Sequence, residues 1–498
     1  MNAVSEMERE KSVSPVLEEN IAAMRAMLHA DKNKDFVARE FVCLEAPACA
    51  MFIEGMAGGD FLDDYILRPL MEHRPASRIS PGKRAGYLLK AAVPINQGKL
   101  SQSLDELVKE LLSGQTAIFL EGCGEAILLD SRKYEMRPVM NPRTEAVVIG
   151  SQEGFVENLR TNLTLVRRYL RSPELITEFM DVGTKISTRC AMVYLDGVAN
   201  ETVVNRVREK IAAIGEAHVL NCGSLAQLLE PRPFLIFPQI LQTERPDRTV
   251  AALTGGQIAL LMDNAPYALI LPVTLFDLIH ASDDSFMRWQ YGTFLRIIRL
   301  LGILVALYLP AMYIAVSTNH SHMIPLKLLT SIAETRVDVP FSVLAEVLFM
   351  EFAFFLINEA GTRIPSQIGS ALGIVGALIL GQAAVSASLI SPILIIIVAL
   401  TGLGNYVVPN YSMGVGIEIL RLLFIAAAAI MGLYGILLAS FVLFGRLGAV
   451  DCFGIPFLAP VAPWRPHNPD IIARLPIWLQ RRLNFYAEGG SWLKKEQK

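Results

Sequence analysis

Two acidic side chains, Glu346 and Glu351, interrupt an otherwise apolar segment that runs from Phe341 to Ile357. An ionised carboxylate at the centre of a bilayer costs about 2.5 to 3.5 kcal/mol, so such a segment faces protein, lies at the interface or lines a wet cavity. A separation of five residues places these carboxylates about 140 degrees apart around a helix. We therefore expect no metal or proton site shared by both. Two roles stay open for one of them: a place beside an ion path, or burial against a polar partner.

A second segment, Pro365 to Ser388, carries no charge and is rich in small residues. Small side chains let membrane helices approach closely, and sparse polar side chains in such a helix can line an ion path. The residues that we expect to line a pore are Gln367, Ser370, Gly373, Ala377, Gly381, Gln382 and Ser386. The alternative is ordinary helix packing with polar groups bonded across helices, and the residues alone favour that alternative.

Motifs of common enzyme sites are missing from the sequence, which contains no G-x-x-x-x-G-K-[ST], no H-E-x-x-H and no G-x-S-x-G. His320 and His322 form NHSH in a predicted loop without a nearby cysteine or carboxylate, so we interpret both as solvated. The cysteines are scattered without a C-x-x-C pair, which argues against a zinc ribbon and a disulfide framework; they are Cys43, Cys49, Cys123, Cys190, Cys222 and Cys452. We expect no catalytic residue, no cofactor and no metal.

Long uncharged stretches would position these residues in a membrane. At about 1.5 Å per residue, roughly 20 residues cross a hydrocarbon core of about 30 Å. The stretches that fit single crossings are Leu300 to Thr318, Pro365 to Ser388, Ser391 to Val408 and Leu422 to Phe444. Four helices are predicted if the segment with the two glutamates does not cross, and five if it does.

Basic residues flank the outermost stretches, as in cytosolic loops of membrane proteins. They are Arg288, Arg296 and Arg299 before the first stretch, and Arg446, Arg465, Arg474, Arg481 and Arg482 after the last. Both termini are therefore expected in the cytosol, which favours the even count. The N-terminus lacks the apolar core of a secretory signal, which agrees with this orientation. A net charge of -3 indicates no nucleic-acid partner.

The front half alternates β-rich runs with amphipathic helices, which predicts an α/β region. Gly114 to Leu129 (GQTAIFLEGCGEAILL) aligns without a gap with Gly256 to Leu271 (GQIALLMDNAPYALIL), at an offset of 142 residues. Both read as a β-hairpin after a short helix. The same offset relates Phe52 to Ala57 and Tyr194 to Ala199, so we infer two related α/β subdomains. The fold class is thus an α/β region of two related subdomains followed by an all-α, multi-span membrane domain.

An amphipathic helix is predicted over Gly154 to Arg171, with apolar residues at helical spacing. Its polar positions hold Arg160, Arg167, Arg168 and Arg171. These arginines form either a contact with an anion or subunit, or a solvated face. We favour the solvated face.

Five stretches resemble signatures of the A subunit of the bacterial spore germinant receptor (GerA) family. They are EGFVENLRTN (Glu153 to Asn162), TERPD (Thr243 to Asp247), EAGTRIPSQIG (Glu359 to Gly369), IVGALILGQAAVSA (Ile374 to Ala387) and FGIPFLAPVAPW (Phe453 to Trp464). Together with the order of the parts, the resemblance covers nearly the whole chain after about residue 36. Gln152 and Asn358 stand where the family usually has arginine.

The resemblance implies an A-type subunit in the inner membrane of a dormant spore, acting with a transporter-like B subunit and a lipoprotein C subunit. Such A subunits are thought to form an oligomeric ion channel that opens on nutrient signalling. A close relative associated with the SpoVA proteins is similar in GEAILLDSRKY (Gly124 to Tyr134), so that paralogue stays open. A different class of function, a non-conducting membrane scaffold for a transporter complex, also stays open.

The expected domains are an N-terminal tail (1–35), two α/β subdomains (36–140 and 141–283), a helical membrane domain (284–445) and a cytosolic tail (446–498). The last tail mixes proline, aromatic and basic residues, which is typical of a segment near anionic lipid. The expected partners are the B and C subunits, further copies of the chain and membrane lipid, with no nucleic acid.

Overall fold

The computed structural model describes residues 12–75, 79–95, 97–132, 142, 145, 147, 149–183, 187–215, 219–363, 381–462, 473–476 and 486. These residues form two compact units, each described by itself. The α/β unit contains the described residues up to Glu230 together with Ile240–Pro272. The helical unit contains Pro231–Gln239 and the described residues from Val273 to Leu483. The finer domain boundaries expected from the sequence remain predictions.

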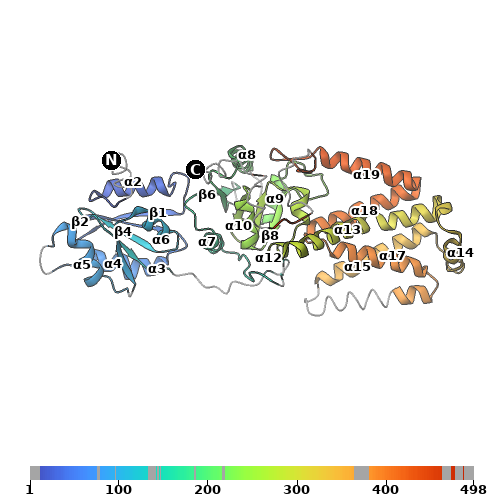
Figure 1. Ribbon diagram of the computed structural model, residues 1–498, viewed down its shortest axis with the longest axis horizontal. Helices are drawn as coiled ribbons and strands as arrows, with labels where there is room; N and C mark the ends of the chain where they lie inside the picture. The colour runs from blue at the N-terminus through green and yellow to red at the C-terminus, as the bar shows by residue number, and fades with distance from the viewer. Residues whose placement is uncertain are drawn as a thin grey trace. The chain divides into compact units, whose positions relative to one another are not determined.

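The first sheet of the α/β unit is antiparallel with strand order β1-β2-β4-β5-β3 (Figure 1). Its strands are β1 (Phe36–Cys43), β2 (Ala46–Ile53), β3 (Gly98–Ser101), β4 (Thr116–Leu120) and β5 (Ala126–Leu129). One face packs against α3 (Gly59–Leu62), a π-helical turn (Asp63–Leu67), α4 (Arg68–Glu72) and α5 (Arg84–Ala91). The other face packs against α2 (Leu17–Met27) and α6 (Leu104–Leu111). Helix α2 contributes Leu17 and Met24 to this core, so a helix that precedes β1 packs against the sheet.

The second sheet repeats this order as β6-β7-β9-β10-β8. Its strands are β6 (Leu175–Val182), β7 (Thr188–Leu195), β8 (Leu241–Thr243), β9 (Ile258–Met262) and β10 (Ala268–Leu271). The helices are α7 (Leu159–Tyr169), α8 (Glu201–Ala212), α9 (Cys222–Leu229) and α10 (Pro246–Thr254). Residues of α7 and α10 share a core with β7 and β9, as α2 and α6 do with their sheet.

The offset of 142 residues holds for element after element. It relates the first residues of α2 and α7, β2 and β7, α6 and α10, β4 and β9, and β5 and β10. The hairpins predicted over Gly114 to Leu129 and Gly256 to Leu271 are confirmed as β4-β5 and β9-β10, each after a short helix. The α/β class of this region is confirmed as well. The strands β4, β5, β9 and β10 are buried along their whole length and nearly continuously apolar, because helices cover both faces of each sheet.

The helical unit begins with α11 (Leu275–Ile279) and α12 (Asp283–Phe286), followed by the long α13 (Trp289–Ile314) and a π-helical turn (Ala315–Asn319). A short 3-10 turn (Ser321–Met323) leads to α14 (Leu326–Glu334), α15 (Val343–Arg363), α17 (Pro392–Tyr406), α18 (Tyr411–Met431) and α19 (Leu433–Gly448). A small hairpin of β11 (Asp451–Cys452) and β12 (Ile455–Pro456) follows. Helix α13 packs against α17 and α18. Gly302 and Gly404 let α13 and α17 touch, since a Cβ on Gly404 would lie 2.5 Å from the Gly302 carbonyl oxygen.

Two helical stretches of the described chain are long and apolar enough to cross a membrane, Trp289–Asn319 and Tyr411–Met431. Pro392–Tyr406 and Leu433–Gly448 are apolar but shorter. The single span predicted for Leu422 to Phe444 is wrong, because Gly432 separates α18 from α19. Gly432 has φ +58° and ψ −138°, a backbone conformation that only glycine adopts readily.

Candidate functional site

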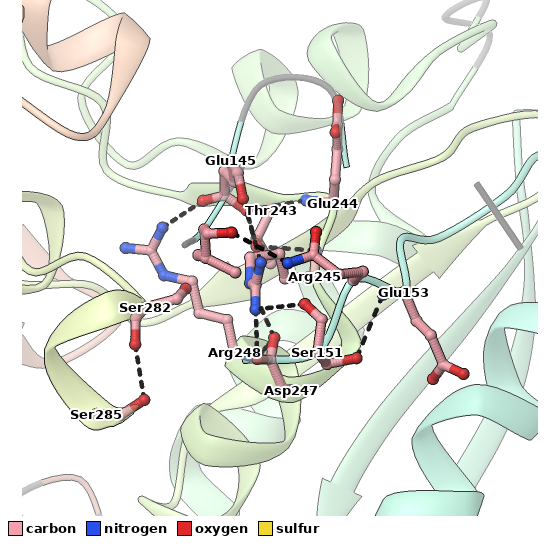
Figure 2. Close-up of polar contacts among 12 residues, drawn as sticks. Glu145, Ser151, Glu153, Thr243, Glu244, Arg245, Asp247, Arg248, Ser282 and Ser285 are labelled. Carbon is pink, nitrogen blue, oxygen red and sulfur yellow. Dashed lines mark hydrogen bonds and ion pairs between the residues drawn. The ribbon is translucent and has the colours of Figure 1, made fainter. Parts of the chain in front are cut away.

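Two of the family-like stretches meet in the α/β unit around Arg245, whose side chain is completely buried (Figure 2). Arg245 lies at the N-cap of α10 and forms a two-point ion pair with Asp247, with N–O distances of 3.0 and 2.6 Å. Nη1 donates to the carbonyl oxygen of Glu145 at 3.2 Å, and Nη2, which also pairs with Asp247, donates to that of Ser151 at 3.1 Å. The guanidinium is therefore a cross-link between α10 and the segment that precedes α7.

Glu145, which belongs to the segment that precedes α7, completes this cluster (Figure 2). Its carboxylate accepts hydrogen bonds from the Thr243 hydroxyl and the Glu244 backbone amide, and it pairs with Arg248. Burial raises the pKa of Tyr267 to about 12, and its hydrogen bond with Glu244 contributes in the same direction. The described polar groups at this cluster are engaged with one another, which indicates a role in stabilising the fold.

One arginine of α7, Arg167, does not lie on the solvated face that the sequence favoured. Arg167 is buried and pairs with Asp35, which precedes β1, through Nε and through Nη2 at 2.7 Å. Nη2 also lies 3.0 Å from the Asn33 side-chain oxygen and 3.3 Å from the Thr177 hydroxyl. Because Asn33 and Asp35 belong to the first half of the unit, Arg167 joins the two sheets with their helices.

The other α7 arginines make weaker contacts at the surface. Arg160 pairs with Glu54 at 2.9 Å, and both side chains are more than one third exposed. Arg168 pairs with Glu153. The prediction of a solvated face therefore holds for partly exposed Arg160 and is wrong for Arg167.

Glu346 is buried at the start of α15 and is fully engaged. One carboxylate oxygen accepts from Arg336 at 2.8 Å, and the other accepts from the Ser391 backbone amide at 3.0 Å. Ser391 is the N-cap of α17, so the carboxylate occupies the position where a helix best accommodates negative charge. This arrangement matches burial against a polar partner.

Glu351, only 2% exposed, pairs with Arg421 of α18 at 2.7 Å. The Arg421 guanidinium also lies over the Phe355 ring, 5.8 Å from its centroid. Glu418 lies only three residues from Arg421 along α18, but Arg421 forms its ion pair with Glu351, which is more distant in the sequence. The two glutamates of α15 thus pair with different arginines, as expected for residues on different faces of a helix.

Glu418 instead accepts from neutral amides. Its Oε1 lies 2.7 Å from the Asn405 side-chain nitrogen and 3.4 Å from that of Asn358. The Tyr406 hydroxyl donates to Asn358 at 2.6 Å. The amide at position 358, where the family usually has arginine, therefore touches a carboxylate without neutralising it.

Most of the predicted pore-lining residues lie outside the described part of the chain. Gln367, Ser370, Gly373 and Ala377 fall there. Gly381 is buried, and a Cβ on it would meet Ile395 at an ordinary distance of 3.6 Å. Gln382 and Ser386 are exposed. Their assignment to a pore stays a prediction.

The two loop histidines differ in environment. His322 is exposed, as predicted for a solvated side chain. His320 is not solvated in this way: its ring packs against Tyr434 at 5.9 Å between centroids, and its Nε2 is buried beside Gly432. The described residues hold no group of three or more His, Cys, Asp and Glu side chains that could bind a metal.

A cluster before α13 went unnoticed in the sequence. Asp284 accepts from Arg299 at 2.6 Å and from Arg296 at 3.2 Å, and all three are buried. Burial opposes ionisation of Asp284, but Arg299 and Arg296 outweigh it and hold its pKa below the usual value. Arg474 donates to the carbonyl oxygens of Ser285 (2.8 Å) and Met287 (2.6 Å). From the sequence, Arg296, Arg299 and Arg474 could be interpreted only as basic residues that flank the apolar stretches.

Comparison with known proteins places the chain in a family. The family model for the Bacillus/Clostridium GerA spore germination protein matches residues 23–485. Spore germination protein KA of Bacillus subtilis (strain 168) is 34% identical over 481 residues, covering 96% of this chain and 88% of that protein. Spore germination protein GerQA of Bacillus cereus is 37% identical over 448 residues, covering 90% of this chain and 88% of that protein.

A membrane protein of Bacillus subtilis (strain 168), YfkQ, is 32% identical over 498 residues, covering 98% of this chain and 95% of that protein. Among solved structures, the N-terminal domain of the A subunit of the Bacillus megaterium spore germinant receptor GerK3 is similar, with a TM-score of 0.41 and 24% identity, over 52% of this chain and 96% of that chain. Because the family model and relatives above 30% identity cover nearly the whole sequence, the chain belongs to the GerA family of spore germination proteins.

Proposed function

We propose that this protein is the A-type subunit of a spore germinant receptor and that its helical unit forms an oligomeric ion channel in the spore inner membrane. Relatives that match this chain over most of their length are named as spore germination proteins, which supports the receptor role. The transporter-like B subunit and the lipoprotein C subunit are the proposed partners, with further copies of the chain and lipid. Nutrient signalling would open the channel.

The observation that carries a membrane location is the inverted polarity of the helical unit. Large apolar side chains are exposed on several helices, among them Leu301, Phe352, Ile430, Leu437 and Phe441. Charged side chains of the same helices are instead buried and paired, as with Glu351 and Arg421. In water this distribution exposes apolar surface and buries charge, both unfavourable, whereas in lipid the exposed side chains are solvated by acyl chains.

The multi-span topology is part of the proposal. Two helical stretches have the length for a full crossing, and α17 and α19 are apolar but shorter. Both termini are proposed to be cytosolic, which requires an even number of crossings. In the same proposal, the α/β unit is a cytosolic platform that transmits the signal to the helices.

Ion flux through liposomes tests the channel. The full-length protein, reconstituted into liposomes loaded with potassium, should release the ion with its partner subunits and nutrient present. Gln382→Leu should abolish this release, because a bulky apolar side chain would replace one of the few polar groups proposed to line the path. Gln227→Leu, at an exposed glutamine of α9 outside the helical unit, is the matched control and should leave flux unchanged. Flux that survives Gln382→Leu, or liposomes that stay tight under every condition, contradicts the channel.

A non-conducting scaffold is the second candidate. One observation favours it: the charged groups between α15, α17 and α18 surround a cavity of only about 10 Å³, which is the room of one water molecule. In that case the helices anchor partner transporters, and liposomes containing this chain alone or with its partners retain their ions. The SpoVA-associated paralogue differs in its partner, so co-purification with SpoVA proteins in place of B and C subunits would identify it.

A further inference from the structure

The cavity between α15, α17 and α18 combines charge, burial and unused oxygen atoms. Its polar lining consists of Glu351, Asn358, Thr401, Asn405, Glu418 and Arg421, and Phe354, Phe355, Val398 and Gly402 complete its walls. A volume of about 10 Å³ admits a single occupant the size of a water molecule.

The lining of this cavity has two carboxylates, Glu351 and Glu418, but one positively charged side chain, Arg421. Arg421 is 2.7 Å from Oε2 of Glu351, so these two charges compensate each other. Among the described residues, Glu418 accepts hydrogen bonds only from the neutral amides of Asn405 and Asn358. The cavity therefore carries a formal charge of about -1 in an apolar helical unit, where buried charges are normally paired.

Two oxygen atoms at the cavity have no hydrogen-bond partner among the described residues: Oε1 of Glu351 and Oδ1 of Asn405. Both are buried acceptors, and Glu351 is only 2% exposed. Unpaired buried acceptors are rare because losing water without a replacement costs about 1 to 3 kcal/mol. They are also the ligands that hard cations prefer.

We propose that this cavity binds one monovalent alkali cation through Glu351 Oε1, Asn405 Oδ1 and the carboxylate of Glu418. A water molecule would donate to the two unpaired oxygens and accept from the unpaired Arg421 Nε, but it would leave the negative charge unbalanced. A cation balances the charge. A divalent ion is disfavoured, because Arg421 already compensates one carboxylate and a single positive charge balances the other.

This site does not depend on ion conduction, since its occupant would tie three helices together within one chain. A cation that stays bound in the folded protein and is lost on unfolding stabilises the folded state. Channel activity and this site can therefore fail separately: liposome flux tests the first, and cation-dependent stability tests the second.

Thermal unfolding of the full-length protein in detergent provides the test. We compare potassium chloride, sodium chloride and N-methyl-D-glucamine chloride at equal ionic strength and pH 8. The wild-type midpoint should be higher by roughly 3 to 6 °C in an alkali salt present at ten times its dissociation constant. Glu418→Gln should lose this difference, because the neutral amide removes the excess charge. Glu334→Gln, at an exposed glutamate of α14, should retain it.

Two further measurements keep the proposal falsifiable if Glu418→Gln does not fold. Glu418→Asp retains the charge at a shorter reach and should show a smaller alkali shift. Lowering the pH in N-methyl-D-glucamine should raise the wild-type midpoint. Protonation of Glu351 or Glu418, which lie near Arg421 and Tyr406, removes the same excess negative charge that an alkali cation would balance. An alkali shift of equal size in wild type and Glu418→Gln overturns the proposal. So does a midpoint that responds to pH but to no alkali cation, since the occupant is then only water or a proton.

Discussion

Removing the carboxylate of Asp35 should loosen the contact between the two sheets of the α/β unit. Arg167 and Asp35 are each less than 5% exposed at the side chain, and a guanidinium cannot lose its charge in a protein. Asp35→Asn therefore leaves a buried cation with neutral partners, which costs about 3 to 5 kcal/mol. At 1.36 kcal/mol per tenfold change, this loss corresponds to a rise in local opening between about 150-fold and 5,000-fold.

Hydrogen exchange measures this opening in the full-length protein in detergent. Backbone amides of α7 and β6 should exchange faster in Asp35→Asn by the factor above, up to the limit set by global unfolding. The double variant Asp35→Leu/Arg167→Met removes both charges and should exchange more slowly than Asp35→Asn, because no buried charge is left unpaired.

The matched control is the exposed ion pair between Arg160 of α7 and Glu54. Glu54→Gln breaks the contact with Arg160, whose side chain is 63% exposed, and a surface pair contributes less than about 1 kcal/mol. Exchange in α7 should then rise by less than about 5-fold. A change below 10-fold in Asp35→Asn, or a double variant that opens more readily than Asp35→Asn, would refute the reasoning.

Two other outcomes follow from the structure. Burial raises the pKa of Cys43 to about 11 and that of Cys49 to about 12, so at pH 8 alkylating reagents should modify both thiols only after denaturation. Thiols in the unfolded chain ionise from about pH 9, whereas these buried thiols stay protonated. The stability of the folded protein should therefore decline as the pH rises from 9 towards 11. Mass spectrometry of alkylated protein checks the first result, and thermal unfolding at several pH values checks the second. Gly432→Ala should destabilise the helical unit by about 1 to 3 kcal/mol, since φ is +58° and a Cβ would lie 2.8 Å from His320 Nε2, whereas Gly445→Ala, with open space around it, should be neutral or stabilising in a thermal unfolding assay. Rapid alkylation of the folded protein, or equal midpoints for the two glycine variants, would contradict these expectations.

Two strand pairs of the α/β unit, β4–β5 and β9–β10, were predictable because their signals are local. Gly114 to Leu129 contains two apolar runs separated by a short turn, and the same pattern recurs 142 residues later. Each sheet also contains pairs that are not hairpins, such as β2 with β4 and β3 with β5, and the sequence analysis did not predict these pairs because helices separate their strands along the chain. The membership of α2 in the first core was missed because the comparison began at β1, although α2 and α7 obey the same offset.

The charged residues were harder to interpret because their partners are distant in sequence. A polar position on an amphipathic helix faces either water or another part of the protein, and nothing within α7 distinguishes the two for Arg167. Likewise, Glu418 is the nearer carboxylate to Arg421 along the helix, but Glu351 reaches it from α15 across the packed interface. The break at Gly432 was hidden because hydropathy is nearly the same on both sides, and only the backbone angle separates the helices.

The first hairpins of the two sheets differ in length while their strand registers correspond. Two residues connect β1 to β2, whereas five connect β6 to β7, and in both cases all eight positions of the strands remain paired. The difference in length therefore does not shift which side chains of the paired strands face each core. The connection between β6 and β7 is accordingly the place to insert an epitope or a fluorescent protein, because a longer connection leaves the strand pairing unchanged.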